Sequence, residues 1–205
     1  MKSKKIIILD DHTLFLKGME LILKEYCPNC DIYTYQSIKK LKHDRLNLRK
    51  FDLLVSDIEL PDEDTFSFFS LLKENYPRLP ILIVSMHKKN AIIKKCKAIG
   101  IEGYLLKHED QQLTKAITTI LSGKEYFSKT IVDFCKQTNN INENLSLREE
   151  EIIKLIAKGH PNQKIALILT LSVETIKTHK RNIKLKLNLK STSDIIDFAK
   201  NNYLL

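Results

Sequence analysis

The sequence predicts two domains of different class: an α/β domain built on a five-stranded parallel sheet, followed by a domain made only of helices. Three observations lead to this prediction. Short apolar runs alternate with longer amphipathic stretches over residues 1–122, a polar segment without periodicity follows near residue 140, and every later stretch has helical spacing. A chain of 205 residues is long enough to bury two modest cores.

Five apolar or β-branched runs have the length of buried strands. They are residues 6–9 (IIIL), 31–35 (DIYTY), 52–56 (DLLVS), 81–85 (ILIVS) and 102–106 (EGYLL). Between them lie helical stretches such as HTLFLKGMELILKEY and TFSFFSLLKENY, whose apolar residues share one face. Strict alternation of strand and helix implies crossover units, and therefore a parallel sheet covered by helices on both faces.

The domain boundaries follow from the change of pattern after Gly123. We expect the first domain over residues 1–122, a linker with room for a short helix (SKTIVDFCK) over 123–144, and the second domain over 145–205. Residues 137–144 (QTNNINEN) are polar, as is typical of a linker. In the second domain Ser146 and Glu149 have the spacing of a capping box. Further helices are expected over residues 162–169, 173–187 and 192–201.

Composition limits the classes of function. The chain carries 34 Lys and Arg against 25 Asp and Glu, a formal net charge of +9, which favours a polyanionic partner, nucleic acid ahead of an anionic membrane. No apolar run approaches the roughly 20 residues that cross a bilayer, and the N-terminus lacks a signal-peptide core, so we expect a cytoplasmic protein. In that compartment the four cysteines, Cys27, Cys30, Cys96 and Cys135, are expected to be free thiols unless they bind a metal or take part in redox chemistry.

Polar residues follow the predicted strands at the edge where parallel α/β sheets bind their ligands. Asp10 and Asp11 follow the first strand, Asp57 the third, Ser85 ends the fourth, and Lys107 follows the fifth. Three crowded carboxylates repel one another unless a cation is supplied, and oxygen ligands suit Mg²⁺. One carboxylate could then attack a phosphoryl group, with the lysine and serine stabilising its oxygens.

The stretches DDH (10–12), LLVSDIELP (53–61), ILIVSMH (81–87) and GYLLK (103–107) resemble the receiver domain of bacterial two-component response regulators. This resemblance implies a flavodoxin-like fold with strand order 2-1-3-4-5. It also implies that Asp57 accepts a phosphoryl group from a histidine kinase. The implied cofactor is Mg²⁺, bound by Asp10, Asp11, Asp57 and the backbone carbonyl of Glu59.

The same resemblance assigns a conformational switch. Ser85 and Tyr104 occupy the positions of the hydroxyl and the aromatic ring that move on phosphorylation, and Lys107 stands beside the phosphoryl group. These movements favour one of two pre-existing packings of the domain. His87 is similar to a position that tunes dephosphorylation. Thr65 stands where the family usually has Gly, which leaves the conformation of that loop open. The acids at 62–64 are interpreted as a loop rim and not as metal ligands.

The C-terminal stretch combines a helix-turn-helix with a cationic helix face. Residues 162–169 and 173–187 are joined by a tight link, with Ser172 as the N-cap of the second helix. Lys177, Arg181 and Lys184 stand at i, i+4 and i+7, so they share one face. Many such faces are only solvated, but a helix of this kind also fits the major groove of DNA.

The sequences LSLREEEIIKLIAKGHPNQKIA and LSVETIKTHKRNIKLKL are similar to the four-helix LuxR-type DNA-binding domain, and the union with a receiver resembles the NarL/FixJ class. This resemblance implies that Lys177, Thr178 and Arg181 face the bases of double-stranded DNA and that Thr175 and His179 contact its phosphate backbone. Lys184 and Ser172 are further candidates for DNA contacts. Lys164 and Asn188 replace the Glu and Gly common in the family. The last helix would form a dimer contact through Ile195, Ile196 and Ala199, which could equally be core residues.

We therefore expect a transcription regulator, not an enzyme, that a cognate histidine kinase phosphorylates on Asp57 and that then dimerises and binds DNA. Two alternatives stay open. An aspartate-nucleophile phosphatase would need Glu59 as its general acid. A redox-responsive or phosphorylation-independent regulator could use Cys27 and Cys30, although this pair lies between a helix end and a strand and not at a helix N-terminus, where the dipole lowers a thiol pKa.

Overall fold

The computed structural model describes residues 3–142 and 145–202, and it divides into two compact units. The first unit comprises residues 1–88 and 93–131, and the second comprises residues 89–92 and 132–205. None of the helices within the described ranges is long and apolar enough to cross a membrane.

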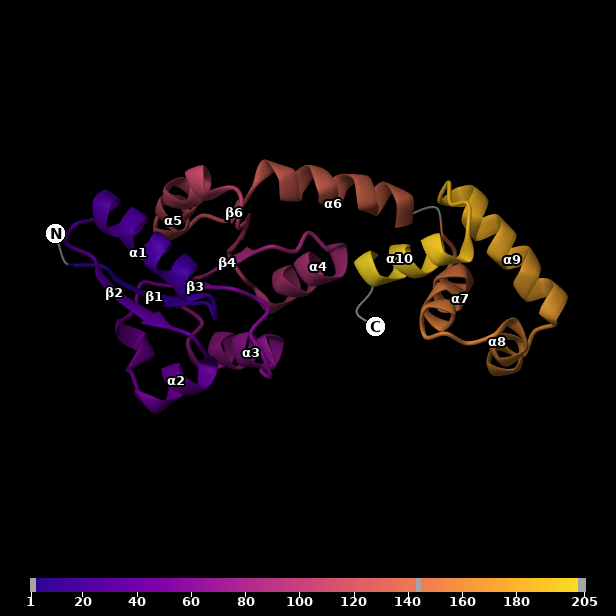
Figure 1. Ribbon diagram of the computed structural model, residues 1–205, viewed down its shortest axis with the longest axis horizontal. Coiled ribbons are helices and arrows are strands. Elements are labelled where there is room, and N and C mark those ends of the chain that lie inside the picture. Colours follow the sequence, from indigo (N-terminus) through magenta and orange to yellow (C-terminus); the bar gives the residue numbers. More distant parts are fainter. Residues whose placement is uncertain (1–2, 143–144, 203–205) are drawn as a thin grey trace. The chain divides into compact units, whose positions relative to one another are not determined.

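The first unit is built on a parallel sheet with the strand order β2-β1-β3-β4-β5-β6 (Figure 1). Its strands are β1 (Lys5–Leu9), β2 (Asp31–Tyr35), β3 (Leu53–Ser56), β4 (Ile81–Ser85), β5 (Gly103–Leu106) and β6 (Tyr126–Phe127). The predicted order of the first five strands is confirmed. Every residue of β3, β4 and β5 is buried, as expected for central strands covered on both faces.

Helices cover both faces of this sheet, with α1 and α5 on one side and α2 and α3 on the other (Figure 1). Their bounds are α1 (Thr13–Tyr26), α2 (Ile38–His43), α3 (Thr65–Asn75), α4 (Asn90–Ile99) and α5 (Leu113–Leu121). Successive side chains of a strand point to opposite faces. Thus Ile6 and Ile8 pack with Leu16 and Met19 of α1 and Ile117 of α5 in one core.

A sixth strand lies beside β5 and was not predicted. Gly103 pairs with Tyr126, and Tyr104 pairs with Phe127. A Cβ on Gly103 would lie 2.5 Å from Cδ1 of Ile120 and 3.1 Å from the carbonyl oxygen of Tyr126, so the absence of a side chain lets α5 and β6 approach. A strand of two residues is too short to give a periodic signal.

The segment predicted as a linker contains a longer helix than expected. Helix α6 runs over Lys129–Asn142, 14 residues, and so includes most of the polar stretch that the sequence predicts as irregular. Adding a residue to an existing helix is much easier than nucleating one, and the first turn of α6 is fixed by the buried side chain of Ile131. The last residues of the predicted linker, 143–144, lie outside the described residues.

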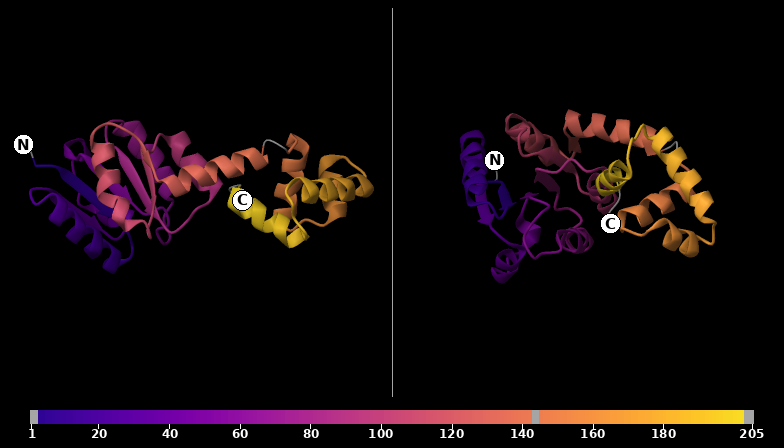
Figure 2. Two further views of the ribbon diagram at one scale, coloured as in Figure 1. Left: turned by 90° about the horizontal axis from the view of Figure 1, so that it is seen from above. Right: turned by 45° about the vertical axis from the view of Figure 1, so that its right-hand side comes forward.

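The second unit contains the four predicted helices α7 (Leu147–Ala157), α8 (Asn162–Leu169), α9 (Val173–Lys186) and α10 (Thr192–Asn202) (Figures 1 and 2). One isoleucine-rich core joins them: Ile152, Ile153, Ile156, Ile165, Ile176, Ile183 and Ile195 are buried together with Ala166 and Ala199. The predicted capping box of Ser146 and Glu149 is present. Lys186 of α9 lies 2.7 Å from the Glu149 carboxylate and so links α9 to the start of α7.

Two of the three residues expected at a dimer contact are core residues of this unit. The side chains of Ile195 and Ala199 are fully buried and pack in the isoleucine-rich core, whereas Ile196 is half-buried. The helical spacing of these residues is the same for a core face and for a contact face, so the sequence could not separate the two. Among them, Ile196 is the residue that retains exposed surface.

The expectation of four free thiols is wrong for one pair, because Cys27 and Cys30 form a disulfide. Cys27 ends α1, where its N–H donates to the carbonyl of Leu23, and the N–H of Cys30 donates to the carbonyl of Cys27. This tight turn brings the two Cα atoms to 5.4 Å, within the range for a disulfide. Cys96, which is buried, and Cys135, which is half-buried, keep their thiols outside any disulfide, as expected.

Two glycines provide opposite tests of the fold. We predict that Gly103→Ala lowers the free energy of unfolding by about 1 to 3 kcal/mol, because the added methyl group overpacks the contact between β5 and α5. Gly18, inside α1, has no atom within 4 Å of an added Cβ. Gly18→Ala is expected to raise the free energy of unfolding by about 1 kcal/mol through helix propensity. Urea titration followed by tyrosine fluorescence measures both, and equal shifts in the same direction would contradict this packing.

Candidate functional site

Three carboxylates converge where β1 and β3 end, as the sequence predicts. The N–H of Asp10 donates to the carbonyl of Tyr35, and the N–H of Asp57 donates to that of Leu9, so the sheet hydrogen bonds fix both residues. Asp10 is fully buried and Asp57 nearly so. Potential ligand atoms of Asp10, Asp11, His12 and Asp57 all lie within 4.8 Å of one another. We call these four residues the acidic cluster.

Lys107 neutralises part of this cluster. Its Nζ lies 2.6 Å from Oδ2 of Asp10 and 2.7 Å from Oδ2 of Asp57, and its side chain is 8% exposed. Burial alone would lower the pKa of Lys107, but the hydrogen bonds and charges of Asp10 and Asp57 outweigh it, and the pKa is raised. The ring centroid of Phe15 lies 4.5 Å from Nζ of Lys107 and adds a cation–π contact that was not predicted.

The acidic cluster fits a hard divalent cation. Three carboxylates face one ammonium group, so the cluster keeps an excess of negative charge that a metal ion could balance. Carboxylate oxygens suit Mg²⁺, which needs few protein ligands because it retains several waters. His12 was not predicted to take part, yet its Nδ1 lies 2.9 Å from Oδ1 of Asp11 and 3.2 Å from Oδ1 of Asp10. The position of His12 directly after Asp10 and Asp11 could have predicted that it lies in the acidic cluster.

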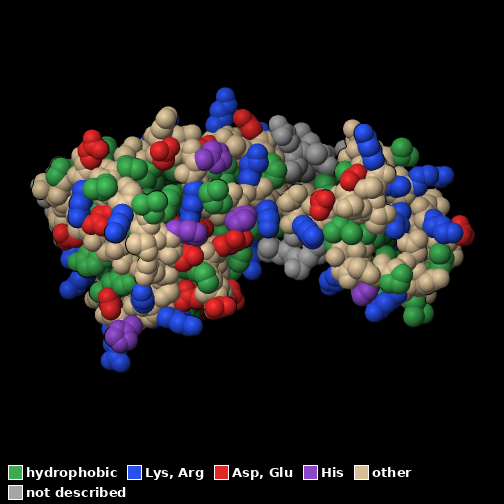
Figure 3. Space-filling view, in the orientation of Figure 1, with side chains coloured by type: hydrophobic (Ala, Val, Ile, Leu, Met, Phe, Trp, Pro, Cys, Tyr) green, Lys and Arg blue, Asp and Glu red, His purple; other side chains and the backbone are tan. Residues whose placement is uncertain are grey.

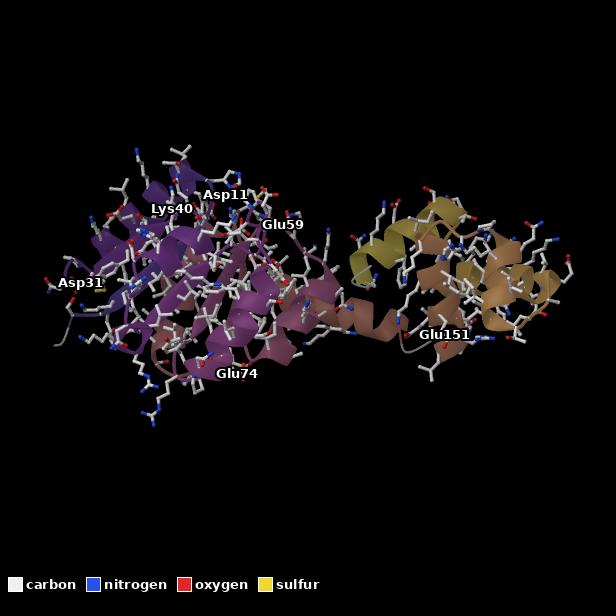
Figure 4. The ribbon with its side chains drawn as sticks, turned by 90° about the horizontal axis from the view of Figure 1, so that it is seen from below. Asp11, Asp31, Lys40, Glu59, Glu74 and Glu151 are labelled. Atoms are coloured by element: carbon white, nitrogen blue, oxygen red, sulfur yellow. A yellow bond between two sulfur atoms is a disulfide. The ribbon has the colours of Figure 1, made fainter. Side chains whose placement is uncertain are left out.

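A cavity of about 450 Å³ opens above Asp57. It is lined by Asp11, His12, Asp57, Ile58, Glu59, Leu60, Pro61, Glu63, Met86, His87 and Lys107. Oδ1 of Asp57 accepts hydrogen bonds from the N–H groups of Ile58 at 2.6 Å and Glu59 at 3.3 Å. Figure 4 shows Asp11 and Glu59 near each other and away from Asp31, at the start of β2. The site therefore lies at the carboxyl edge of the strands, where it is expected.

A contact between the side chains of Glu59 and His87, which both line this cavity, was not predicted. Nε2 of His87 lies 2.6 Å from Oε2 of Glu59. The backbone of His87 is fixed by the hydroxyl of Tyr104, which donates to its carbonyl at 2.8 Å. The Glu59 side chain is thus held by His87. The predicted role of Glu59 as a Mg²⁺ ligand uses only its backbone carbonyl.

The two predicted switch residues are both fully buried. Oγ of Ser85 accepts a hydrogen bond from the N–H of His87 at 3.3 Å. The ring of Tyr104 lies inside the unit, and burial raises the pKa of Tyr104 well above its ordinary value, so the phenol is protonated at neutral pH. Ser85, Tyr104 and His87 form one connected group beside the acidic cluster.

Acidic side chains in the loop after Pro61 form hydrogen bonds with the first residues of two neighbouring helices. Glu63 accepts from the N–H groups of Ile38 and Lys39 at the start of α2, and Asp64 caps α3 by accepting from the N–H of Ser67. Asp62 has a left-handed backbone, with φ of 57°. The hydroxyl of Thr65 donates to the carbonyl of Ile58 at 2.6 Å. Thr65 therefore ties this loop to the residue after Asp57, which gives a physical role to the departure from glycine.

Helix α9 presents most of the predicted DNA-contacting side chains to solvent. Lys177, Thr178 and Arg181 are exposed, as is Ser172, whose hydroxyl caps the helix by accepting from the N–H of Thr175. Three further candidates are half-buried, namely Thr175, His179 and Lys184. Figure 3 shows Lys and Arg side chains on the surface around α9, and the buried Ile176 and Ile183 lie on another face of this helix. This arrangement matches a cationic groove-binding face.

Two other features of the helix-turn-helix bear on its geometry. Lys180 is half-buried, and its Nζ donates to Oδ1 of Asn162 at 3.1 Å, which joins α9 to the start of α8. Burial and then the nearby Lys184 lower the pKa of Lys180. Asn188, after α9, has φ of 52°, so it adopts the left-handed conformation expected of a residue that replaces glycine.

Comparisons with known proteins agree with this division of the chain. Residues 6–118 match the response regulator receiver domain, and residues 143–199 match the bacterial regulatory proteins of the luxR family. The oxygen regulatory protein NreC of Staphylococcus epidermidis is 31% identical over 216 residues, which cover 98% of this chain and 99% of that protein. NreC of Staphylococcus carnosus is likewise 31% identical over 215 residues, with the same coverage.

Solved structures share the fold. A structure of the RcsB response regulator of Salmonella typhimurium has a TM-score of 0.77 at 23% identity, and the match covers 97% of this chain and 100% of that one. A structure of RcsB in complex with DNA has a TM-score of 0.73 at 24% identity, with coverage of 98% and 99%. Both family matches and the full-length relatives lead to one conclusion. The chain belongs to the NarL/FixJ class of response regulators, in which a receiver domain precedes a LuxR-type DNA-binding domain.

Proposed function

We propose that Asp57 accepts a phosphoryl group from a cognate histidine kinase and that this event promotes dimerisation and DNA binding. The single observation that carries the proposal is the nearly buried Asp57 carboxylate, which contacts Lys107, lies beside the other acids and lines an open cavity. Mg²⁺ would be held by Asp10, Asp11, Asp57 and the backbone carbonyl of Glu59. When bound, it would neutralise the charge that builds up on the phosphoryl oxygens.

Residues of the chain would orient the acceptor. The N–H groups of Ile58 and Glu59 hold Oδ1 of Asp57, so Oδ2, now paired with Lys107, would be the oxygen that attacks. Attack of a carboxylate oxygen on phosphorus and departure of the donor would leave an acyl phosphate on Asp57. Lys107 would then exchange part of its contact with the carboxylates for the phosphoryl oxygens, and Ser85 would donate a hydrogen bond to one of them.

The switch would act through Ser85 and Tyr104. A Ser85 hydroxyl drawn toward the phosphoryl group would change the surroundings of His87, whose N–H donates to it, and of Tyr104, which donates to the carbonyl of His87. The phosphoryl group would in this way favour one of two packings of the receiver. For the second domain we propose base contacts through Lys177, Thr178 and Arg181, and backbone contacts through Thr175, His179, Lys184 and Ser172. In the dimer contact Ile196 would take part.

Labelling with a small phosphodonor tests whether Asp57 is the phosphoryl acceptor. With Mg²⁺ and a small phosphodonor such as acetyl phosphate, the wild-type protein should gain one phosphoryl group by intact mass, and Asp57→Asn should gain none. Asp62→Asn is the matched control, because it makes the same chemical change in the exposed acidic loop. Removal of Mg²⁺ by a chelator should also abolish labelling. Full labelling of Asp57→Asn would exclude Asp57 as the acceptor.

The second prediction concerns the recognition helix. Arg181→Ala should weaken binding to DNA selected by the wild-type protein by about 10- to 100-fold, the effect of losing a bidentate base contact. Lys200→Ala removes the same charge from an exposed position on α10 and is expected to change affinity much less. Electrophoretic mobility shifts at fixed salt measure both. Equal losses in the two variants would mean that Arg181 supplies charge alone and no specific contact.

The disulfide favours a second candidate, a regulator that also responds to redox state. Reduction of Cys27–Cys30 should lower the free energy of unfolding by about 2 kcal/mol, the chain-entropy value for so short a loop. If the pair is regulatory, reductant should change the DNA affinity of the wild-type protein and leave that of Cys27→Ser/Cys30→Ser unchanged. An identical response of both proteins to reductant would limit the disulfide to a structural role.

A further inference from the structure

Glu109 is a buried carboxylate outside the acidic cluster, two residues after Lys107. Its N–H donates to the carbonyl of Leu106 at 2.9 Å, and its Oε2 accepts from the N–H of Leu106 at 3.1 Å. This reciprocal pair closes a turn around the end of β5. Because Leu106 directly precedes Lys107, Glu109 fixes the backbone from which the Lys107 side chain reaches Asp10 and Asp57.

The other oxygen of Glu109 contacts a different element. Oε1 accepts a hydrogen bond at 2.7 Å from the hydroxyl of Thr130, in the first turn of α6. Burial acts to raise the pKa of Glu109, but hydrogen bonds from Ser128, Thr130 and the N–H of Leu106 outweigh it and lower the pKa. The group is therefore a charged acceptor at neutral pH, and hydrogen bonds to charged groups are the stronger kind.

The backbone forms a second connection between β5 and α6. The N–H of Ser128 donates to the carbonyl of Tyr104 at 3.1 Å, which continues the pairing of β6 with β5. Ser128 is 1% exposed, and its hydroxyl accepts from the N–H of Ile131, whose side chain is fully buried. The first turn of α6 is thus attached to the strand that holds Tyr104 and precedes Lys107.

We propose that Glu109 is a positioning residue that fastens the first turn of α6 to the end of β5, so that a displacement of Lys107 is passed to α6. This inference rests on the proposed phosphorylation of Asp57. The ammonium group of Lys107 is held by Asp10 and Asp57 in the present structure, and a phosphoryl group on Asp57 changes what it binds. Helix α6 begins in the receiver and leads along the chain to the LuxR-type domain.

The variant Thr130→Val tests the connection with little risk to folding, because Thr130 is exposed and valine has nearly the same shape. Thr130→Ser restores the hydroxyl, and Glu109→Gln removes the charge while keeping the shape. Thr119→Val is the matched control, since the Thr119 hydroxyl bonds only within α5, to the carbonyl of Lys115. The full chain of each variant is measured by amide hydrogen exchange, with and without Mg²⁺ and beryllofluoride as a phosphoryl mimic.

Without the mimic, the amides of residues 131–135 should exchange about tenfold faster in Thr130→Val and Glu109→Gln than in the wild type, as for the loss of one charged hydrogen bond. Thr130→Ser and Thr119→Val should match the wild type. Adding the mimic should change exchange in these residues in the wild type and change it less in Thr130→Val, while acetyl phosphate labels Asp57 equally in both.

Unchanged exchange in Thr130→Val without the mimic would overturn the anchor, and an undiminished response to the mimic would overturn its role in transmission. Absence of label on wild-type Asp57 would instead refute the proposed phosphorylation and with it the transmission step. The measurement without the mimic needs no phosphorylation and would still decide whether Glu109 holds α6.

Discussion

The ion pairs of Lys107 with Asp10 and Asp57 are the interaction on which the first domain's site depends. Buried carboxylates at the ends of adjacent strands would otherwise face each other without compensation, which is costly in a low-dielectric interior. Lys107 directly follows β5, which is separated from β3 by β4, so a single side chain reaches across the edge of the sheet. Its compensation is partial, and the remaining negative charge is what makes the cluster suitable for a metal ion.

Much of this arrangement could be predicted because central parallel strands are recognisable as continuous apolar runs. Once β1, β3 and β5 were placed, the residues after them had to meet at one edge, so Asp10, Asp57 and Lys107 were found from position alone. Contacts between side chains that are distant in sequence gave no such signal. The contact of Glu59 with His87 and the hydrogen bond of Thr130 to Glu109 depend on how loops pack, which no local sequence pattern reports.

The departures from the sequence predictions have local physical causes. Strand β6 is held by backbone pairing to β5 and by space left at Gly103, neither of which alters hydrophobic periodicity. Helix α6 continues through polar residues because its first turn is already fixed in the receiver. Thr65 replaces a glycine without loss of order because its hydroxyl gives the loop a bond to Ile58 that glycine could not make.

In the proposed switch, the charge of a phosphoryl group on Asp57 would have little direct electrostatic effect on α9. A phosphoryl group adds between one and two negative charges at neutral pH, but it would lie in a cluster that already contains Lys107 and that a divalent cation would neutralise further. On α9, Lys177 and Arg181 are exposed to solvent, where salt screens interactions beyond about 8 Å. In the proposed switch, contacts would therefore carry the change, and the hydrogen bonds between β5, β6 and the first turn of α6 connect the Lys107 loop to the segment that precedes the LuxR-type domain.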